Sequence, residues 1–167
     1  MEEKQVQNYV IAALVEHKPG VLYEVANMFR RRNFNIESIS VGATERADIA
    51  RMTLNVRGDE ATIEQIVKQL NKLINVIKVF LLEPESRVAR ELALVKVYTA
   101  DSKARSDIIQ YASIFRGRIV DVSQDSIIVE VTGVSDKIDA FINLSRSFGI
   151  KEVARTGIAA LNRGREK

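Results

Sequence analysis

Hydrophobic and polar positions follow two different periods along the first half of the chain. Residues 9–15 are a nearly unbroken apolar run, which is typical of a buried strand. A helix is predicted over residues 21–32, where the apolar side chains recur at helical spacing, as Leu22, Val25, Ala26 and Phe29. Pro19 stands just ahead of this stretch, where the start of a helix accepts proline. The chain therefore opens with a strand followed by a helix.

Two more strands, a second helix and a last strand follow. Apolar and polar residues alternate over residues 36–41 and again over residues 50–57, as in half-buried strands. Residues 63–73 return to helical spacing, and residues 76–82 read as a fourth strand. This β-α-β-β-α-β order predicts an α+β, ferredoxin-like domain, with an antiparallel sheet that carries both helices on one face.

The same order of elements recurs after the acidic, proline-containing break at residues 83–86. The expected elements are strands at 92–98, 118–122, 127–131 and 152–157, and helices at 106–115 and 137–144. About 80 residues suffice for each copy of this unit. We therefore predict two related ferredoxin-like domains, residues 1–83 and residues 84–167.

Composition removes several classes of function. The 167 residues include 25 Lys plus Arg, 22 Asp plus Glu, no Cys and a single His. Without cysteine there is no disulfide framework, thiolate zinc site or cysteine nucleophile, and only His17 could serve a Ser-His-Asp triad. No apolar run approaches the roughly 20 residues of a membrane span, and the polar N-terminus is unlike a signal peptide. We expect a cytoplasmic protein without membrane contact.

The search for catalytic or metal-binding residues is mostly negative. Glu16 and His17 could form an acid-base pair, but a solvated loop histidine is the simpler interpretation. Arg30–Arg32 suit the end of a helix better than a nucleic-acid surface, because no stacking aromatics are interleaved with them. Glycine-rich phosphate loops and clustered metal ligands are absent from the sequence. We therefore predict no catalytic residue, no metal site and no nucleic-acid partner.

One constellation does suit ligand binding. Gly20 opens the helix in the segment Pro19–Leu22, where free backbone N–H groups and the helix dipole can hold a carboxylate. We expect this turn to lie near the start of the next strand, where the amide of Asn35, beside Ile36, could pair with an amino or carboxylate group. A plain turn explains the same residues equally well on spacing alone.

The sequence itself resembles a known family. Residues 17–22, His-Lys-Pro-Gly-Val-Leu, and residues 29–42, which include Phe-Asn-Ile-Glu-Ser, are similar to the N-terminal ACT domain of the acetolactate synthase (acetohydroxyacid synthase) small subunit. Residues 114–122, Ile-Phe-Arg-Gly-Arg-Ile-Val-Asp-Val, resemble the second domain of that subunit. The resemblance extends from about Asn8 to Gly164.

The resemblance implies a regulatory subunit that has no active site of its own. In that family the small subunit binds a catalytic large subunit, raises its activity and confers feedback inhibition by a branched-chain amino acid, usually valine. The large subunit carries thiamine diphosphate, FAD and magnesium, and condenses two pyruvates, or pyruvate with 2-oxobutyrate.

The family also implies a dimer in which ACT domains pair edge to edge and hold the amino acid between them. The matching positions here are His17, Gly20, Val21 and Leu22 of one copy with Asn35 and Ile36 of the other. At position 17 the family often has Asn, so histidine would add a pH dependence to binding.

Two alternatives stay open at this point. The chain could be a free-standing ACT-type amino acid sensor that acts on a different enzyme or regulator, or an autonomous enzyme that uses Glu16 and His17. For the surface that contacts the large subunit, the second domain and the basic tail with Arg163, Arg165 and Lys167 are the candidates.

Overall fold

The computed structural model describes residues 6–164, which divide into two compact units. The first unit holds residues 6–88 together with 157–164, and the second holds residues 89–156. The predicted boundary after residue 83 assigned residues 84–167 to the second domain. In the structure, residues 84–88 and 157–164 group with the first unit, because the chain returns to it after the second is complete. Arg165 and Lys167 of the predicted basic tail lie outside the described residues.

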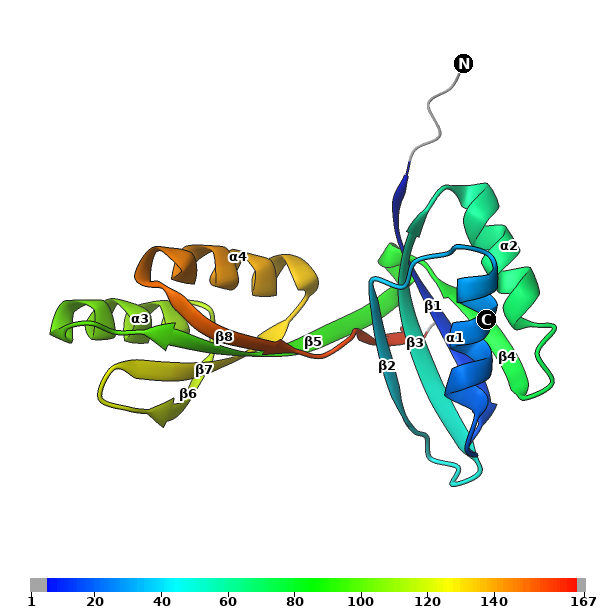
Figure 1. Ribbon diagram of the computed structural model, residues 1–167, viewed down its shortest axis with the longest axis horizontal. Coiled ribbons are helices and arrows are strands. Elements are labelled where there is room, and N and C mark those ends of the chain that lie inside the picture. The colour runs from blue at the N-terminus through cyan, green and yellow to red at the C-terminus, as the bar shows by residue number, and fades with distance from the viewer. Residues whose placement is uncertain (1–5, 165–167) are drawn as a thin grey trace, which may run out of the picture. The chain divides into compact units, whose positions relative to one another are not determined.

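The first unit has the predicted β-α-β-β-α-β order. Its elements are β1 (Gln7–Glu16), α1 (Val21–Arg31), β2 (Ser38–Ala43), β3 (Ile49–Gly58), α2 (Glu60–Leu70) and β4 (Val76–Leu82). The strands form an antiparallel sheet in the order β2-β3-β1-β4, and both helices cover one face of it (Figure 1). The ferredoxin-like fold predicted for this part of the chain is confirmed.

The core of this unit lies between the sheet and the two helices. Alternate residues of β1 and β3 face the helices, and α1 and α2 each turn one apolar stripe toward the sheet. The buried members include Ile11, Val15, Met52, Leu54, Val25, Phe29, Ile66 and Leu70. Burying one such side chain stabilises the fold by about 1.5–3 kcal/mol, so the apolar periodicity of the sequence decides which faces meet.

The second unit repeats the pattern. Its elements are β5 (Arg87–Tyr98), α3 (Ser102–Ile114), β6 (Arg118–Val122), β7 (Ser126–Gly133), α4 (Ser135–Ser145) and β8 (Ile150–Arg155), with short 3-10 turns at Pro84–Ser86 and Arg146–Phe148. The sheet order β6-β7-β5-β8 corresponds strand for strand to that of the first unit. Helices α3 and α4 lie on one face (Figure 1), and the second ferredoxin-like domain is confirmed as well.

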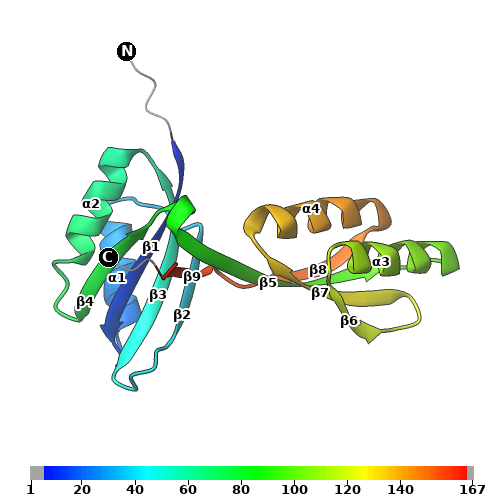
Figure 2. The ribbon, with the colours of Figure 1, turned by 180° about the vertical axis from the view of Figure 1, so that it is seen from behind.

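One strand was missed by the sequence. Strand β9 (Ala159–Asn162) pairs with the beginning of β5, and the Arg163 N–H donates to the Ser86 carbonyl at 2.7 Å. Figure 2 views the first sheet from the side away from its helices and shows β9 in front of it. We call residues 157–162 the strap. Ile158 and Ala160 of the strap are buried, and so are Val10 and Ala12, whose side chains leave β1 on this face.

A glycine allows the strap to cross the sheet. A β-carbon at Gly157 would lie 2.4 Å from the carbonyl oxygen of Ile39 and 2.9 Å from the amide nitrogen of Ser40. Both atoms belong to the backbone of β2, which cannot move aside independently of its sheet. The strap therefore passes directly against β2, and only glycine fits at the crossing.

Candidate functional site

Helix α1 begins at a glycine and is left open at that end. Gly20 is its N-cap and has φ 91° and ψ −21°, in the left-handed region that side chains disfavour. The first intrahelical bond runs from the Glu24 N–H to the Gly20 carbonyl at 3.0 Å, and no side chain of the described residues caps the helix. The N–H groups of residues 21–23 are therefore available to a ligand, at the positive end of the helix dipole.

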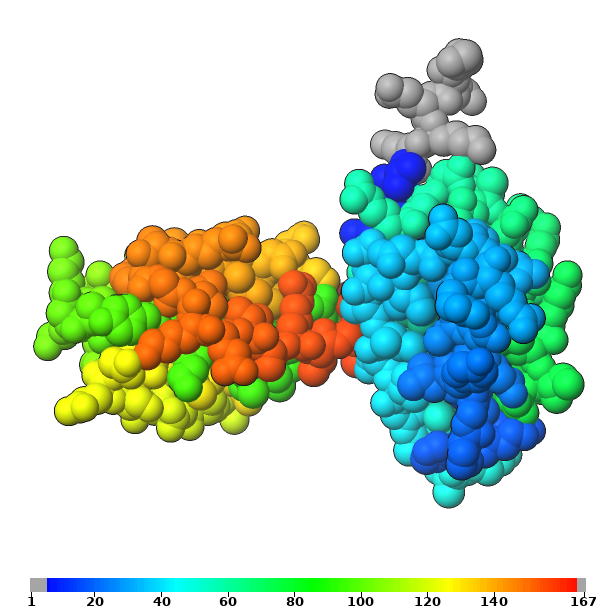
Figure 3. Space-filling view, in the orientation of Figure 1, coloured from blue at the N-terminus to red at the C-terminus, as the bar shows by residue number. Residues whose placement is uncertain are grey.

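The space around this helix start is open. A β-carbon at Gly20 would meet no described atom within 4 Å, so glycine is required there by the backbone conformation and not by crowding. Val21 is buried in the core, whereas Leu22 is 48% exposed. Figure 3 shows α1 uncovered on the face of the first unit that is turned toward the viewer. A small carboxylate could thus approach the N–H groups from solvent, with an aliphatic side chain beside it.

The turn ahead of α1 is held by the hairpin between β2 and β3. The His17 main-chain N–H donates to the Asp48 carbonyl at 2.8 Å, and the His17 Nδ1 lies 3.3 Å from the Ala47 carbonyl oxygen. Within the hairpin, Arg46 Nη2 donates to Asp48 Oδ2 at 2.9 Å, and this hydrogen bond lowers the pKa of the Asp48 carboxyl. Residues 44–48 could not be recognised from the sequence as part of the site, because their contribution comes from backbone carbonyls.

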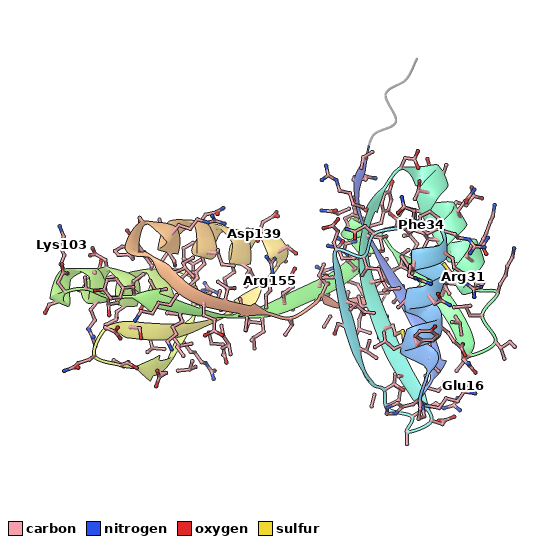
Figure 4. All side chains as sticks on the ribbon, in the orientation of Figure 1. Glu16, Arg31, Phe34, Lys103, Asp139 and Arg155 are labelled. Atoms are coloured by element: carbon pink, nitrogen blue, oxygen red, sulfur yellow. The ribbon has the colours of Figure 1, made fainter. Side chains whose placement is uncertain are left out.

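Asn35 and Ile36 do not lie near this turn in the same chain, so that prediction is wrong. The two segments are joined by α1, whose 11 residues span about 16 Å at 1.5 Å per residue. In Figure 4 the labelled Glu16 and Phe34, which neighbour the two segments, lie at opposite ends of the sheet. The error came from the topology: in this fold α1 runs back along the sheet, so it separates the end of β1 from the start of β2.

At the far end of α1, both residues are placed for contact from outside. Asn35 is exposed, and its Nδ2 donates to Glu37 Oε1 at 2.9 Å. Ile36 is half-buried against the core, and both residues precede β2, which begins at Ser38. Since β2 is an edge strand, the segment lies at the border of the sheet. One chain therefore presents two separate halves of the predicted constellation.

The remaining residues singled out by the sequence form no reactive cluster. The Glu16 carboxylate pairs with Lys18 Nζ at 2.5 Å, and no hydrogen bond joins it to His17 within residues 6–164. Arg30 and Arg31 lie in the last turn of α1, where they face the negative end of the dipole. No group of three or more His, Cys, Asp or Glu in the described part of the chain is arranged to hold a metal ion. None of the described helices is long and apolar enough to cross a bilayer.

Comparison with known proteins covers both units. A family described as AHAS small subunit-like ACT domain matches residues 11–78, and one described as small subunit of acetolactate synthase matches residues 90–164. The chain is similar to a probable acetolactate synthase small subunit of Methanothermobacter thermautotrophicus, at 61% identity over 98% of each chain. It is also similar to one from Archaeoglobus fulgidus, at 57% identity over 95% of this chain and 99% of the relative.

A solved structure agrees over almost the whole chain. The crystal structure of the acetolactate synthase small subunit from Thermotoga maritima superposes with a TM-score of 0.88 at 47% sequence identity. The match covers 96% of this chain and 99% of the other. Both units, and not only the amino-terminal one, therefore have their counterparts in the same proteins.

Proposed function

The chain belongs to the acetolactate synthase small-subunit family, and from this we propose that it activates a catalytic large subunit and makes it sensitive to feedback inhibition by valine or a related branched-chain amino acid. The effector binds between two copies of the ACT unit. The open N-terminus of α1 at Gly20 is the observation that carries this proposal, because its N–H groups can hold a carboxylate and no side chain of residues 6–164 caps them.

The geometry of β2 favours a dimer that joins the two halves of the site. Ala43 at the end of β2 pairs with Ala50, and Glu16 at the end of β1 pairs with the adjacent Ile49, so β2 ends level with the turn before α1. If two β2 edges meet antiparallel about a two-fold axis, the start of one strand lies beside the end of the other. Asn35 and Ile36 of one copy then approach Gly20 of the second.

The two halves suit different parts of a branched-chain amino acid. The N–H groups of Val21 and Leu22 take the carboxylate, and the Asn35 side-chain oxygen can accept from the ammonium group. Leu22 and the half-buried Ile36 offer aliphatic surface to the side chain. His17 lies in the turn before α1, at the rim of this proposed site.

In this proposal the chemistry takes place on the partner. The large subunit carries the thiamine diphosphate, FAD and magnesium that condense two pyruvates or pyruvate with 2-oxobutyrate, and the present chain contributes no catalytic residue. A free-standing ACT sensor for another enzyme is less well supported, since residues 90–164 match the synthase small subunit specifically. We expect the complex in the cytoplasm.

The test is reconstitution of the two subunits. Purified chain is added to its cognate catalytic subunit, and acetolactate formation is measured with and without valine, leucine and isoleucine. We expect stimulation by the chain and inhibition by one of the three amino acids, with calorimetry giving its affinity for the chain alone. Absence of both stimulation and inhibition would contradict the proposal.

A further inference from the structure

The first unit has a groove that the effector site does not use. It has a volume of about 690 Å³ and lies between α2 and the sheet, where β1 begins and β4 ends. Its floor is apolar and consists of Tyr9, Ile63, Val67 and Leu81. Leu81 is 37% exposed although it points toward the helix face of the sheet. Cavities of this size accommodate several side chains.

The rim of this groove carries charge of one sign. Glu60 and Glu64 of α2 line it from one side and Glu83 from the other, and no described Lys or Arg is among the lining residues. Lys68 Nζ lies 2.7 Å from Glu64 Oε1, but both side chains are about two-thirds exposed, so this ion pair is weak. A basic side chain of a partner can therefore replace Lys68 beside Glu64. The whole chain has a net charge of +3, so the three carboxylates give the groove rim a charge opposite to that of the chain.

The groove lies beside the sheet edge that the proposed dimer leaves free. In the order β2-β3-β1-β4, the dimer and its effector occupy the β2 edge, while the groove adjoins β4 at the opposite edge. A two-fold dimer formed through β2 uses each β2 edge once and closes upon itself, so it does not cover β4. The groove therefore stays accessible to a different polypeptide.

We propose that this acid-rimmed groove is where the chain holds its catalytic large subunit, and that the occupant is a cationic segment with aliphatic side chains. Aliphatic groups of the segment contact Tyr9 and Leu81, and its Lys or Arg side chains meet Glu60, Glu64 and Glu83. This inference rests on the proposed function, because it assumes that the large subunit is the partner. It places the contact on the first unit, unlike the second domain and basic tail suggested by the sequence.

The test is charge reversal, with binding of the purified catalytic subunit to the full chain as the readout. For the double variant Glu60→Lys with Glu83→Lys we expect the dissociation constant to rise at least about tenfold at low salt, with a weaker salt dependence than the wild type. Leu81→Asp places a carboxylate in the apolar floor of the groove, at a partly exposed position, and should weaken binding of the segment's aliphatic side chains. Effector affinity by calorimetry should be unchanged in both variants, which shows that the ACT unit is folded.

A matched double reversal in the second unit, Asp136→Lys with Glu152→Lys, is the control and should bind as the wild type does. If the groove variants bind normally while the wild type activates the large subunit, the groove assignment fails and the proposed function stands. If the wild type itself neither binds nor activates, the proposed function fails. The inference is also overturned if the groove variants change only the self-association of the chain, measured by sedimentation, since the occupant is then a second copy.

Discussion

The two units share one scaffold but begin their first helices in opposite ways. Helix α1 starts at Gly20, in the left-handed conformation and without a side-chain cap. Helix α3, its counterpart, starts at Asp101, whose Oδ1 accepts from the Ala104 N–H at 2.8 Å. In the second unit the chain's own carboxylate occupies the position that a ligand carboxylate could take in the first. The contrast between α1 and α3 supports the proposal that the effector binds to the first unit.

The ends of the same two helices are nearly identical. The Asn33 N–H donates to the Arg30 carbonyl and the Phe34 N–H to the Phe29 carbonyl, and after α3 the Arg116 and Gly117 N–H groups form the same pair of bonds. This is a Schellman motif, which needs a left-handed residue, and Asn33 and Arg116 have φ of 56° and 50°. Because the helix ends agree, the difference at the helix starts is local.

The faces away from the helices also differ. In the first unit the strap covers part of this face, and Val10 and Ala12 are buried beneath it. In the second unit, Leu94 and Tyr98 of β5 lie on the face away from the helices and are 37% and 40% exposed. The strap adds a layer to the first unit and, at Gly157, lies against β2, the strand that carries the proposed dimer contact.

The largest effect should come from making the two helix starts alike. Gly20→Asp places a carboxylate at the open end of α1, as Asp101 does on α3. We expect effector affinity to fall by at least about tenfold, through repulsion of the ligand carboxylate and loss of its N–H partners. Activation of the catalytic subunit should largely remain. Calorimetry and inhibition assays measure the two responses.

Gly149→Asp is the matched control, because Gly149 also has a left-handed φ, of 92°, and a β-carbon there would meet only Tyr98 Cβ, at 3.8 Å. This variant should keep the wild-type affinity. Undiminished inhibition of the Gly20→Asp protein would show that the effector carboxylate binds elsewhere.

A second, smaller effect should follow when the strap is displaced. Gly157→Ala brings a β-carbon to 2.4 Å from the Ile39 carbonyl oxygen, so the strap or β2 must shift. We expect the free energy of unfolding to drop by about 1–3 kcal/mol, as in other overpacked sites. Gly164→Ala is the control. Unfolding in urea gives the values, and an unchanged stability would mean that the strap does not rest on β2.

A third test removes the side-chain caps of α2 and α3. Asp59 Oδ1 accepts from the Thr62 N–H at 2.8 Å at the start of α2, in parallel with Asp101 on α3. Replacing either residue by Ala should cost about 1 kcal/mol of stability. Effector affinity should stay constant in both, because neither helix start belongs to the site. A large loss of affinity in Asp101→Ala alone would mean that the second unit also binds the ligand.

Much of the fold could be predicted because the helices and the inner strands of each unit bury apolar residues at regular spacing. The apolar spacing identifies the type of each element and the side that faces the core. Examples are the alternation of Met52, Leu54 and Val56 in β3 and the spacing of Val25 and Phe29 in α1. The strap could not be found in this way. Its four-residue strand β9 is too short for a periodic signal, and its burial depends on a crossing with β2 that is distant in sequence.

Single residues of the candidate site could be predicted from the sequence, but their positions relative to one another could not. Gly20 after Pro19 marks a helix start from sequence alone, and its left-handed conformation agrees with the residue type. The juxtaposition with Asn35 was wrong within one chain, because the direction of α1 along the sheet decides which ends meet. The predicted effector contacts of His17, Gly20, Val21, Leu22, Asn35 and Ile36 stay a prediction that a bound ligand must test.

The smallest effect should come from one exposed ion pair in each unit. In the first unit Arg46 lowers the pKa of the Asp48 carboxyl, and in the second Lys151 Nζ lies 2.5 Å from Asp125 Oδ2 and lowers the pKa of that carboxyl. A carboxyl whose pKa is lower in the folded state stabilises it above the unfolded pKa of about 3.9, and this contribution is lost as pH falls through the folded pKa. Asp125→Asn and Asp48→Asn should therefore each reduce the melting temperature only slightly at neutral pH, with the difference from the wild type vanishing in acid.

The Arg46–Asp48 pair also allows a test of what holds the turn before α1 in place. Asp48→Asn keeps the backbone carbonyl that accepts from the His17 N–H, so the turn before α1 should hold its position and effector affinity should not change. Asp125→Asn serves as the control, because it removes an exposed ion pair of the same kind in the second unit, outside the proposed site. Calorimetry on both variants separates the two roles of the hairpin: a loss of affinity in Asp48→Asn alone would mean that the Arg46–Asp48 pair, and not the carbonyl, holds the turn.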